Sequence, residues 1–209
     1  MRYASYPAVI GVCGEFGSGK DEVANIMSEA FGYARFAFGD DVKMEEARVL
    51  LDENYRSFLW DTMPESTRDA VLTCLALGEL DPFGKPTSPD MRELHQQYGT
   101  EFRRGQDPDY WVNLTEHRFK SSKAARIFFS DVRFPNEETL IRRYRGQLWR
   151  VTRDAGLYQK SYDIHLIQHV SERNLARLVP DVVIDNRGSL DDLRRNVHQA
   201  MRNLRLRAA

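Results

Sequence analysis

A glycine-rich stretch that ends in lysine is the part of this sequence best suited to chemistry. After the apolar residues 8–13 come Gly14 and Gly19, and Lys20 follows directly. Glycines let the backbone approach an anion without a Cβ in the way, so that successive N–H groups point at phosphate oxygens. A helix that starts at residue 20 adds its positive dipole end, and the lysine adds a mobile charge. The pattern predicts a loop that binds nucleotide phosphates.

The residues after the lysine depart from the usual form of such a loop. A Ser or Thr hydroxyl that binds Mg²⁺ is expected there, whereas this chain has Asp21 and Glu22. Because Mg²⁺ takes oxygen ligands and keeps several waters, a carboxylate could serve the metal directly or through water. We therefore expect a magnesium-dependent site. The alternative is a glycine-rich strand-to-helix turn without a ligand.

Bulk composition limits the class of protein. The chain has 209 residues and a formal net charge of -1, from 30 basic and 31 acidic residues, which argues against a nucleic-acid binder. Its two cysteines, Cys13 and Cys74, lack metal-ligand spacing, so a reducing cytoplasm is the simplest compartment. We find neither a long apolar segment nor a signal peptide, and expect no membrane association.

Short apolar runs alternate with helical patterns along the chain, which predicts an α/β fold with a parallel sheet of about five strands flanked by helices. The expected strands are residues 8–13, 34–38, 126–130, 147–152 and 181–184. The expected helices are residues 20–31, 42–51, 89–104, 109–119, 136–144 and 190–206. We expect a single domain over residues 1–209, with an inserted helical lobe at 52–120 and a lid at 154–174.

Ligands of open parallel sheets bind beyond the carboxyl ends of the strands. In this chain every segment that follows an expected strand carries charged or amide groups. These segments are residues 14–20, 39–41, 131–137, 153–154 and 185–186. Asp131 ends a strand as a magnesium carboxylate would, although it could equally bind an acceptor substrate or a helix N-terminus.

Several motifs together resemble one family. They are residues 14–21, 98–104 with Trp111, the run Asp-Val-Arg-Phe-Pro-Asn-Glu at 131–137, His169-Val-Ser-Glu, and Asp185-Asn-Arg-Gly-Ser-Leu. In this order they resemble the P-loop deoxynucleoside monophosphate kinases of tailed bacteriophages. The resemblance covers most of the chain and is weakest over residues 52–88. It implies transfer of the γ-phosphoryl of ATP, with Mg²⁺, to a deoxynucleoside 5′-monophosphate, in the host cytoplasm if the gene is a phage's.

The resemblance also implies roles for individual residues. Those expected at ATP are Gly14, Gly17, Ser18, Gly19, Lys20 and Asp21. Those expected at the acceptor nucleotide are Arg92, Gly99, Thr100, Trp111, Asp131, Arg133 and Glu137. Lys20, Arg133 and Arg153 are the expected catalytic groups, and Asp21 and Asp131 the expected metal ligands.

Five of the chemically suggestive residues have alternative roles. Trp111 could stack on a base or pack inside the protein. Arg103 and Arg104 could clamp an acceptor phosphate, although adjacent helix residues diverge and one of them is expected in a surface ion pair. His169, with His165, suits a hydrogen bond that closes a lid better than a metal site, because a third ligand of firm spacing is missing.

Two other functions remain compatible with the sequence. One is a P-loop kinase of another small molecule, of the dephospho-coenzyme A or phosphomevalonate type, because the fold alone does not select the acceptor. The other is a regulatory protein that binds ATP without an acceptor. The expected lobe and charged strand ends favour a kinase. The accepted bases, the preference between deoxyribose and ribose, and a homodimer are left open.

Overall fold

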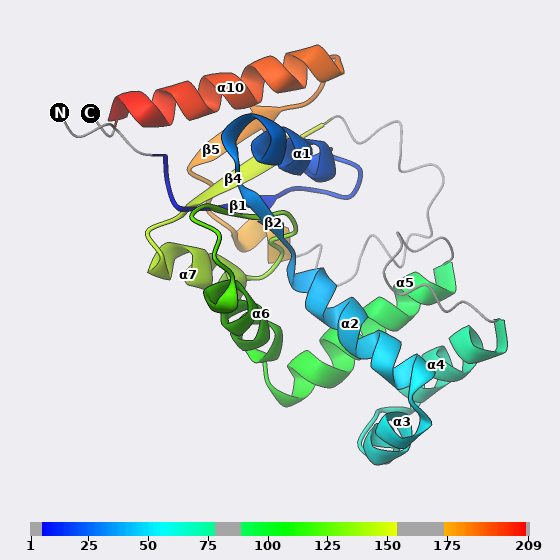
Figure 1. The fold of residues 1–209 in the computed structure, drawn as a ribbon. Helices are drawn as coiled ribbons and strands as arrows, with labels where there is room; N and C mark the ends of the chain where they lie inside the picture. The colour runs from blue at the N-terminus through cyan, green and yellow to red at the C-terminus, as the bar shows by residue number, and fades with distance from the viewer. Residues whose placement is uncertain (1–5, 78–88, 154–173, 208–209) are drawn as a thin grey trace. The chain divides into compact units, whose positions relative to one another are not determined.

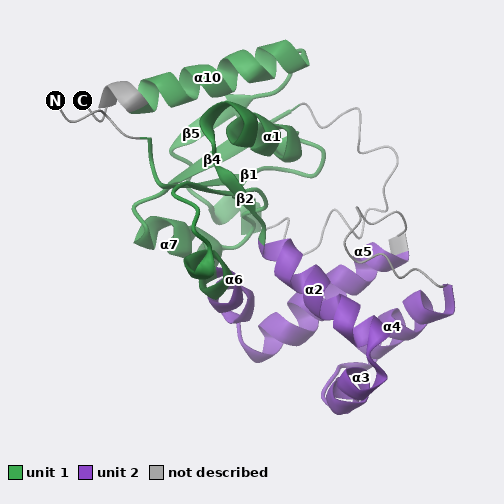
Figure 2. Cartoon of the chain, in the orientation of Figure 1, with its two compact units in different colours: residues 1–37, 116–209 green, residues 38–115 purple. Residues whose placement is uncertain are grey.

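The computed structural model describes residues 6–77, 89–153 and 174–207 (Figure 1). The chain divides into two compact units, unit 1 with residues 1–37 and 116–209 and unit 2 with residues 38–115 (Figure 2). The expected lid at 154–174, apart from Asn174, and both histidines assigned to it lie outside the described residues. Among the described helices, none combines the length and apolar character that a membrane span requires.

Unit 1 is built on the expected parallel sheet of five strands. These are β1 (Val9–Cys13), β2 (Ala34–Phe36), β3 (Ile127–Phe129), β4 (Gln147–Thr152) and β5 (Val182–Asp185). Their order is β2-β3-β1-β4-β5, and every pair is parallel. β1 lies at the centre, with Gly11 opposite Phe129 on one side and Leu148 on the other. The α/β fold class predicted from the sequence is confirmed.

Helices cover both faces of this sheet. α1 (Lys20–Phe31) and α10 (Leu190–Arg207) share one buried core with Ile10 and Val12 of β1. Gly11, which points the other way, faces Ile141 of α7 (Pro135–Arg143). Figure 1 shows α1 and α10 on one side of the strands and α7 on the other. Successive side chains of β1 point to opposite faces of the sheet, and this alternation determines which helices pack against each face.

Residues at the helix ends explain where helices of unit 1 begin and end. Gly32, with φ 68°, ends α1 in the left-handed conformation and donates its N–H to the Ser28 carbonyl at 3.1 Å. A capping box starts α10, because the Asp192 N–H donates to Ser189 Oγ at 3.2 Å and the Ser189 N–H to Asp192 Oδ2 at 2.8 Å. Pro135 is the first residue of α7, one residue before the expected start of that helix, and suits the position because its fixed φ is helical.

One strand-end loop predicted from the sequence is helical instead. The strand expected at 34–38 ends at Phe36, and α2 (Phe38–Leu51) begins four residues before the predicted helix. The segment 39–41, expected as a loop beyond the sheet, is therefore the first turn of α2. Asp40 and Asp41 suit that turn because carboxylates stabilise the positive end of a helix.

Unit 2 is a bundle of helices with its own core. It holds α2, α3 (Glu53–Trp60), α4 (Glu65–Leu77), α5 (Pro89–Gln96), the π-helix η1 (Gln97–Arg104) and the start of α6 (Tyr110–Ser121). Unit 2 includes α2, whereas the lobe expected at 52–120 does not. The sequence analysis did not distinguish α3, although Asp52 is a recognisable N-cap and accepts the Tyr55 N–H at 3.1 Å.

The second half of the helix predicted at 89–104 is a π-helix. Its i→i+5 bonding brings Tyr98 and Arg103 together, and Arg103 Nη2 donates to the Tyr98 hydroxyl at 3.3 Å. Five residues apart in an α-helix, the two side chains would point about 140° away from each other. Both side chains reach Glu45 of α2, so tertiary contacts accompany the altered helical register.

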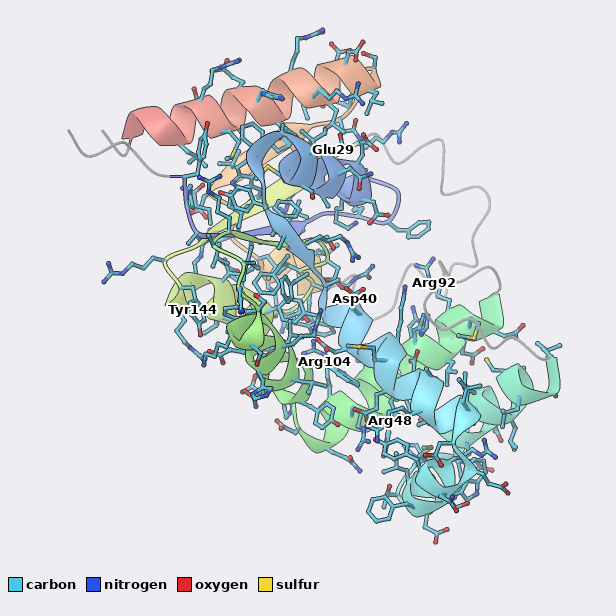
Figure 3. The ribbon with its side chains drawn as sticks, viewed as in Figure 1. Glu29, Asp40, Arg48, Arg92, Arg104 and Tyr144 are labelled. Carbon is cyan, nitrogen blue, oxygen red and sulfur yellow. The ribbon has the colours of Figure 1, made fainter. Side chains whose placement is uncertain are left out.

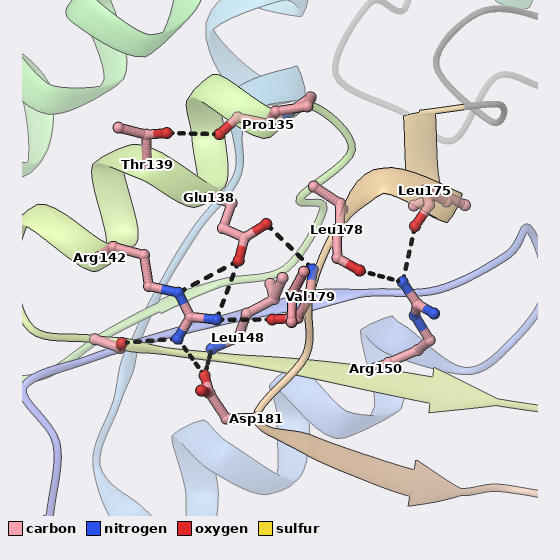
Figure 4. Close-up of polar contacts among 11 residues, drawn as sticks. Pro135, Glu138, Thr139, Arg142, Leu148, Arg150, Leu175, Leu178, Val179 and Asp181 are labelled. Carbon is pink, nitrogen blue, oxygen red and sulfur yellow. Dashed lines mark hydrogen bonds and ion pairs between the residues drawn. The ribbon is translucent and has the colours of Figure 1, made fainter.

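Two arginines hold the irregular chain that leads into β5 (Figure 4). Arg150 Nη2 on β4 donates to the carbonyls of Leu175 and Leu178 at 2.8 and 2.9 Å. Arg142 on α7 pairs with Asp181 and donates to the Val179 carbonyl at 2.7 Å. The two guanidinium groups thus bind backbone carbonyls of the segment before β5, which includes the short 3-10 helix η4 (Asn174–Arg177).

The close packing of β1 on α7 predicts a stability effect. Changing Gly11 to Ala would place a methyl group into Ile141 Cδ1 and Val132 Cγ2, both fully buried. We expect a loss of about 1–3 kcal/mol, or roughly 3–10 °C in the thermal midpoint, measured by calorimetry. Gly105→Ala is the control, because Gly105 has a helical φ of -64° and a Cβ there would meet nothing within 4 Å. Equal midpoints for the two variants would contradict this packing argument.

Candidate phosphate-binding site

The loop between β1 and α1 has the backbone of an anion site. Gly14, Gly17 and Gly19 have positive φ angles of 151°, 74° and 98°, which side chains rarely adopt. A Cβ on Gly14 would also lie 2.5 Å from the Val151 carbonyl oxygen. Two constraints, backbone conformation and lack of space, therefore require glycine at Gly14. The loop ends at Lys20, the first residue of α1.

The lysine lies against its own loop. Lys20 Nζ donates to the carbonyls of Gly14 and Glu15, both at 2.8 Å, and lies 3.5 Å from Ser18 Oγ. The Ser18 side chain belongs to the buried interior of the loop. The ammonium therefore lies over the turn of the loop. Because its glycines carry no side chains, an anion could approach the N–H groups of this turn.

The segment after β3 reaches the same edge of the sheet. The Val132 N–H donates to the Val12 carbonyl at 3.0 Å, which ties the segment that carries Asp131 and Arg133 to the strand before the glycine loop. Asp131 and Arg133 are both half-buried. The sequence prediction that the carboxyl ends of β1 and β3 bring these residues to one edge is confirmed.

Glu137 has a structural role that the sequence analysis did not assign. Its buried carboxylate accepts the N–H groups of Arg133 at 2.6 Å and Phe134 at 3.0 Å. It therefore caps α7 and fixes the backbone that carries Arg133. The sequence gives only half of a capping-box signature here, because Glu137 stands three positions after Phe134, whose side chain cannot accept a hydrogen bond as Ser or Thr would. A contact of Glu137 with the acceptor remains a prediction.

The ends of β4 and β5 complete the edge. Arg153, exposed, follows β4 directly, and Asp185 at the end of β5 is paired with Thr152. The next residue, Asn186, donates its side-chain amide to the Ser18 carbonyl at 2.7 Å. The residue after β5 is therefore in direct contact with the glycine loop, a contact that the sequence analysis did not assign.

Two carboxylates could hold a magnesium ion at this edge. Asp21 lies in the first turn of α1 and Asp131 follows β3. The described residues contain no group of three or more His, Cys, Asp or Glu suited to a metal ion. Mg²⁺ is usually bound by one or two carboxylates together with substrate phosphates and water, so these oxygen donors fit its chemistry.

The other residues expected at the acceptor lie in unit 2. Arg92 is half-buried on α5 (Figure 3), and Gly99 and Thr100 lie in η1. Trp111 is only 1% exposed, and its indole N–H donates to the Gly99 carbonyl at 2.7 Å. Of the two alternatives for Trp111, the structure shows interior packing. Stacking on a base would require the ring to be uncovered.

A buried carboxylate organises the interior of unit 2. Glu45 accepts the hydroxyls of Tyr98 at 2.8 Å and Tyr110 at 2.7 Å and forms an ion pair with Arg103. Burial, followed by the nearby carboxylate, raises the pKa of Tyr98, so both phenols stay neutral donors. The expectation of a surface ion pair is wrong for Arg103, whose pair is interior. Arg104 donates to the Pro108 carbonyl at 3.1 Å.

Glu46, the residue after Glu45, is a second buried carboxylate of unit 2. Glu46 is 0% exposed and hydrogen-bonds His95 Nδ1 through Oε2, while Oε1 and His95 Nε2 have no hydrogen-bond partner among the described residues. Burial raises the pKa of Glu46, and the hydrogen bond with His95 opposes that rise. This pair was not expected from the sequence, although Glu46 precedes the buried residues Val49 and Leu50 by three and four positions on α2, which is helical spacing.

Comparisons with known proteins agree with this geometry at the level of fold. No protein-family model matches the chain, and no curated protein matches its sequence. The structure is similar to TT1252 from Thermus thermophilus, with a TM-score of 0.51 and 22% identity over 96% of this chain and 99% of that one. It is also similar to the dephospho-CoA kinase from Campylobacter jejuni, with a TM-score of 0.52 and 12% identity over 97% and 99%. The chain thus shares the P-loop fold predicted from its sequence.

Burial of Glu46 predicts a pH effect on stability. Because its folded pKa is raised above the reference value of 4.5, its stabilising contribution is complete below that pH and is lost as pH rises through the folded pKa. Glu46→Gln cannot ionise, so its thermal midpoint should rise relative to that of the wild type as the pH increases above about 4.5. The exposed Glu29→Gln controls for a lost charge (Figure 3). A difference that does not vary with pH would contradict the argument.

Proposed function

We propose that this protein transfers the γ-phosphoryl group of ATP to a deoxynucleoside 5′-monophosphate, giving ADP and the diphosphate. The observation that carries the proposal is the loop of three positive-φ glycines closed by Lys20 at the start of α1. The fold shared with a dephospho-CoA kinase supports the coarser part, a P-loop kinase of small molecules. The choice of a deoxynucleotide acceptor comes from the resemblance of the sequence motifs to phage kinases.

The loop suits the charge that phosphoryl transfer must stabilise. Catalysis of this reaction depends on alignment and on neutralising charge on the transferring group, because little covalent help is needed. Backbone N–H groups of the loop and the N-terminus of α1 would bind the β- and γ-phosphates. Lys20 would exchange the carbonyls of Gly14 and Glu15 for phosphate oxygens, which are stronger acceptors for an ammonium.

Arginines and carboxylates of the neighbouring strand ends would complete the donor site. Arg133 and Arg153 can each hold phosphate oxygens with a planar guanidinium. Glu137 keeps the backbone of Arg133 in place. Asp21 and Asp131 would hold Mg²⁺, which when bound neutralises phosphate charge.

Four of the proposed acceptor residues, Arg92, Gly99, Thr100 and Trp111, lie in unit 2. Arg92 offers a guanidinium for the acceptor phosphate, and Gly99 and Thr100 offer a close backbone approach and a hydroxyl. Trp111 would act indirectly, because its indole N–H holds the Gly99 carbonyl. Acceptors of the dephospho-coenzyme A type are the second candidate, which the C. jejuni structure favours at the level of fold. A regulatory ATP-binding protein would need no acceptor.

Turnover with a panel of acceptors tests the proposal. We expect ADP release, measured in a coupled assay, to rise with deoxynucleoside monophosphates and not with dephospho-coenzyme A or mevalonate phosphate. Lys20→Met should lower turnover by about 10²-fold or more, because the ammonium matters most as charge spreads in the transition state. Lys123→Met, on an exposed lysine, is the control. ADP release that responds to no acceptor would support the regulatory protein instead.

The position of Asp21 directly after Lys20 predicts that replacing Asp21 changes the magnesium dependence of the reaction. If Asp21 replaces the usual hydroxyl, Asp21→Ala should raise the Mg²⁺ concentration needed for half-maximal rate as well as lower the rate. Asp21→Ser restores a hydroxyl and should retain more activity. Magnesium titrations of both variants make the comparison. A lower rate with unchanged metal dependence would remove Asp21 from the proposed metal site.

A further inference from the structure

Asn186, the first residue after β5, makes a polar contact with the glycine loop across 168 residues of sequence. Its side chain is buried, with the residue 8% exposed, and Nδ2 donates to the Ser18 carbonyl at 2.7 Å. Ser18 is itself only 3% exposed. A Cβ on Gly19 would overlap this same amide, so the Asn186 side chain lies directly against the Ser18–Gly19 peptide.

The amide is held in place by elements other than the loop. The backbone N–H of Asn186 donates to the Thr152 carbonyl at 2.8 Å, which continues the pairing of β4 and β5. Asn196 of α10 donates its side-chain amide to the Asp185 carbonyl at 2.8 Å. The donor that meets Ser18 is therefore positioned by the sheet and by α10 before any ligand binds.

Peptide geometry gives this contact a consequence for phosphate binding. The Ser18 C=O and the Gly19 N–H belong to one planar trans peptide, so they point in opposite directions. Holding the carbonyl toward Asn186 directs the N–H to the other side of the loop. Gly19 has φ 98° and no side chain to restrict it, so the peptide depends on such a contact to keep one orientation.

We propose that Asn186 is a positioning residue that locks the Ser18–Gly19 peptide with the Gly19 N–H directed at the nucleotide phosphates. This inference rests on the proposed function, since it assigns the anion to a nucleotide. A reversed peptide would present the Ser18 carbonyl oxygen to the phosphates, and two acceptors repel each other. Only a donor can hold the carbonyl, so an amide suits this position and the isosteric carboxylate does not.

The test compares two variants with a matched control. Asn186→Ala removes the amide, and Asn186→Asp keeps its shape but replaces the donor by a charged acceptor. Asn203→Ala removes an exposed amide of α10. We expect the Kd of Mg-ADP, measured by calorimetry, to rise about tenfold in Asn186→Ala and more in Asn186→Asp, with no change in Asn203→Ala. The KM for ATP should rise likewise, while the KM for the acceptor stays constant.

A merely structural role would give a different result. Lower thermal midpoints with unchanged Kd for Mg-ADP in both Asn186 variants would overturn the proposal. If the wild type binds no nucleotide, the proposed function fails, and a crystal structure of Asn186→Asp tests the lock by itself. A reversed or split Ser18–Gly19 peptide in that structure would support the lock, and an unchanged peptide would overturn it.

Discussion

Parallel pairing of β1 with β3 on one side and with β4 on the other is the constraint on which the rest of unit 1 depends. Because the three strands run in the same direction, the loops that follow them emerge at one edge of the sheet. A slip of β1 by one residue would turn Gly11 away from α7 and press a larger side chain against Ile141. Packing therefore fixes the register, and the register brings the glycine loop, Asp131 and Arg153 to the same edge.

The glycine loop is preorganised by contacts from several elements. Lys20 holds the carbonyls at the start of the loop, Val151 of β4 leaves no space for a side chain on Gly14, and Asn186 after β5 holds Ser18. Donors that are already oriented need little rearrangement when charge develops, which is where enzymes gain most from electrostatics. Under the proposed function, the surrounding sheet would thus contribute to phosphate binding although it offers the anion few side chains.

Unit 2 is organised by buried charge as well as by apolar packing. Glu45 is satisfied by Tyr98, Tyr110 and Arg103, which come from η1 and α6. Removing one partner of such a buried pair is strongly destabilising, because the other charge is left without compensation. This network also explains why η1 has a π-helical register, which brings Tyr98 and Arg103 to the same carboxylate. The neighbouring Glu46 is less fully compensated, because one of its carboxylate oxygens has no hydrogen-bond partner among the described residues, and its burial raises its pKa.

The sequence by itself determined what depends on near neighbours along the chain. The glycine loop, the βαβ alternation, the proline that starts α7 and the capping box at Ser189 could all be recognised, because each follows from residues a few positions apart. Tertiary structure alone decided the contact of Asn186 with Ser18, the burial of Trp111 and the partners of Glu45. These side chains meet groups far away in the sequence, 168 residues away for Asn186 and 53 for the contact of Tyr98 with Glu45. Whether such a side chain faces a ligand or the interior depends on how the helices and strands pack, which local patterns do not specify.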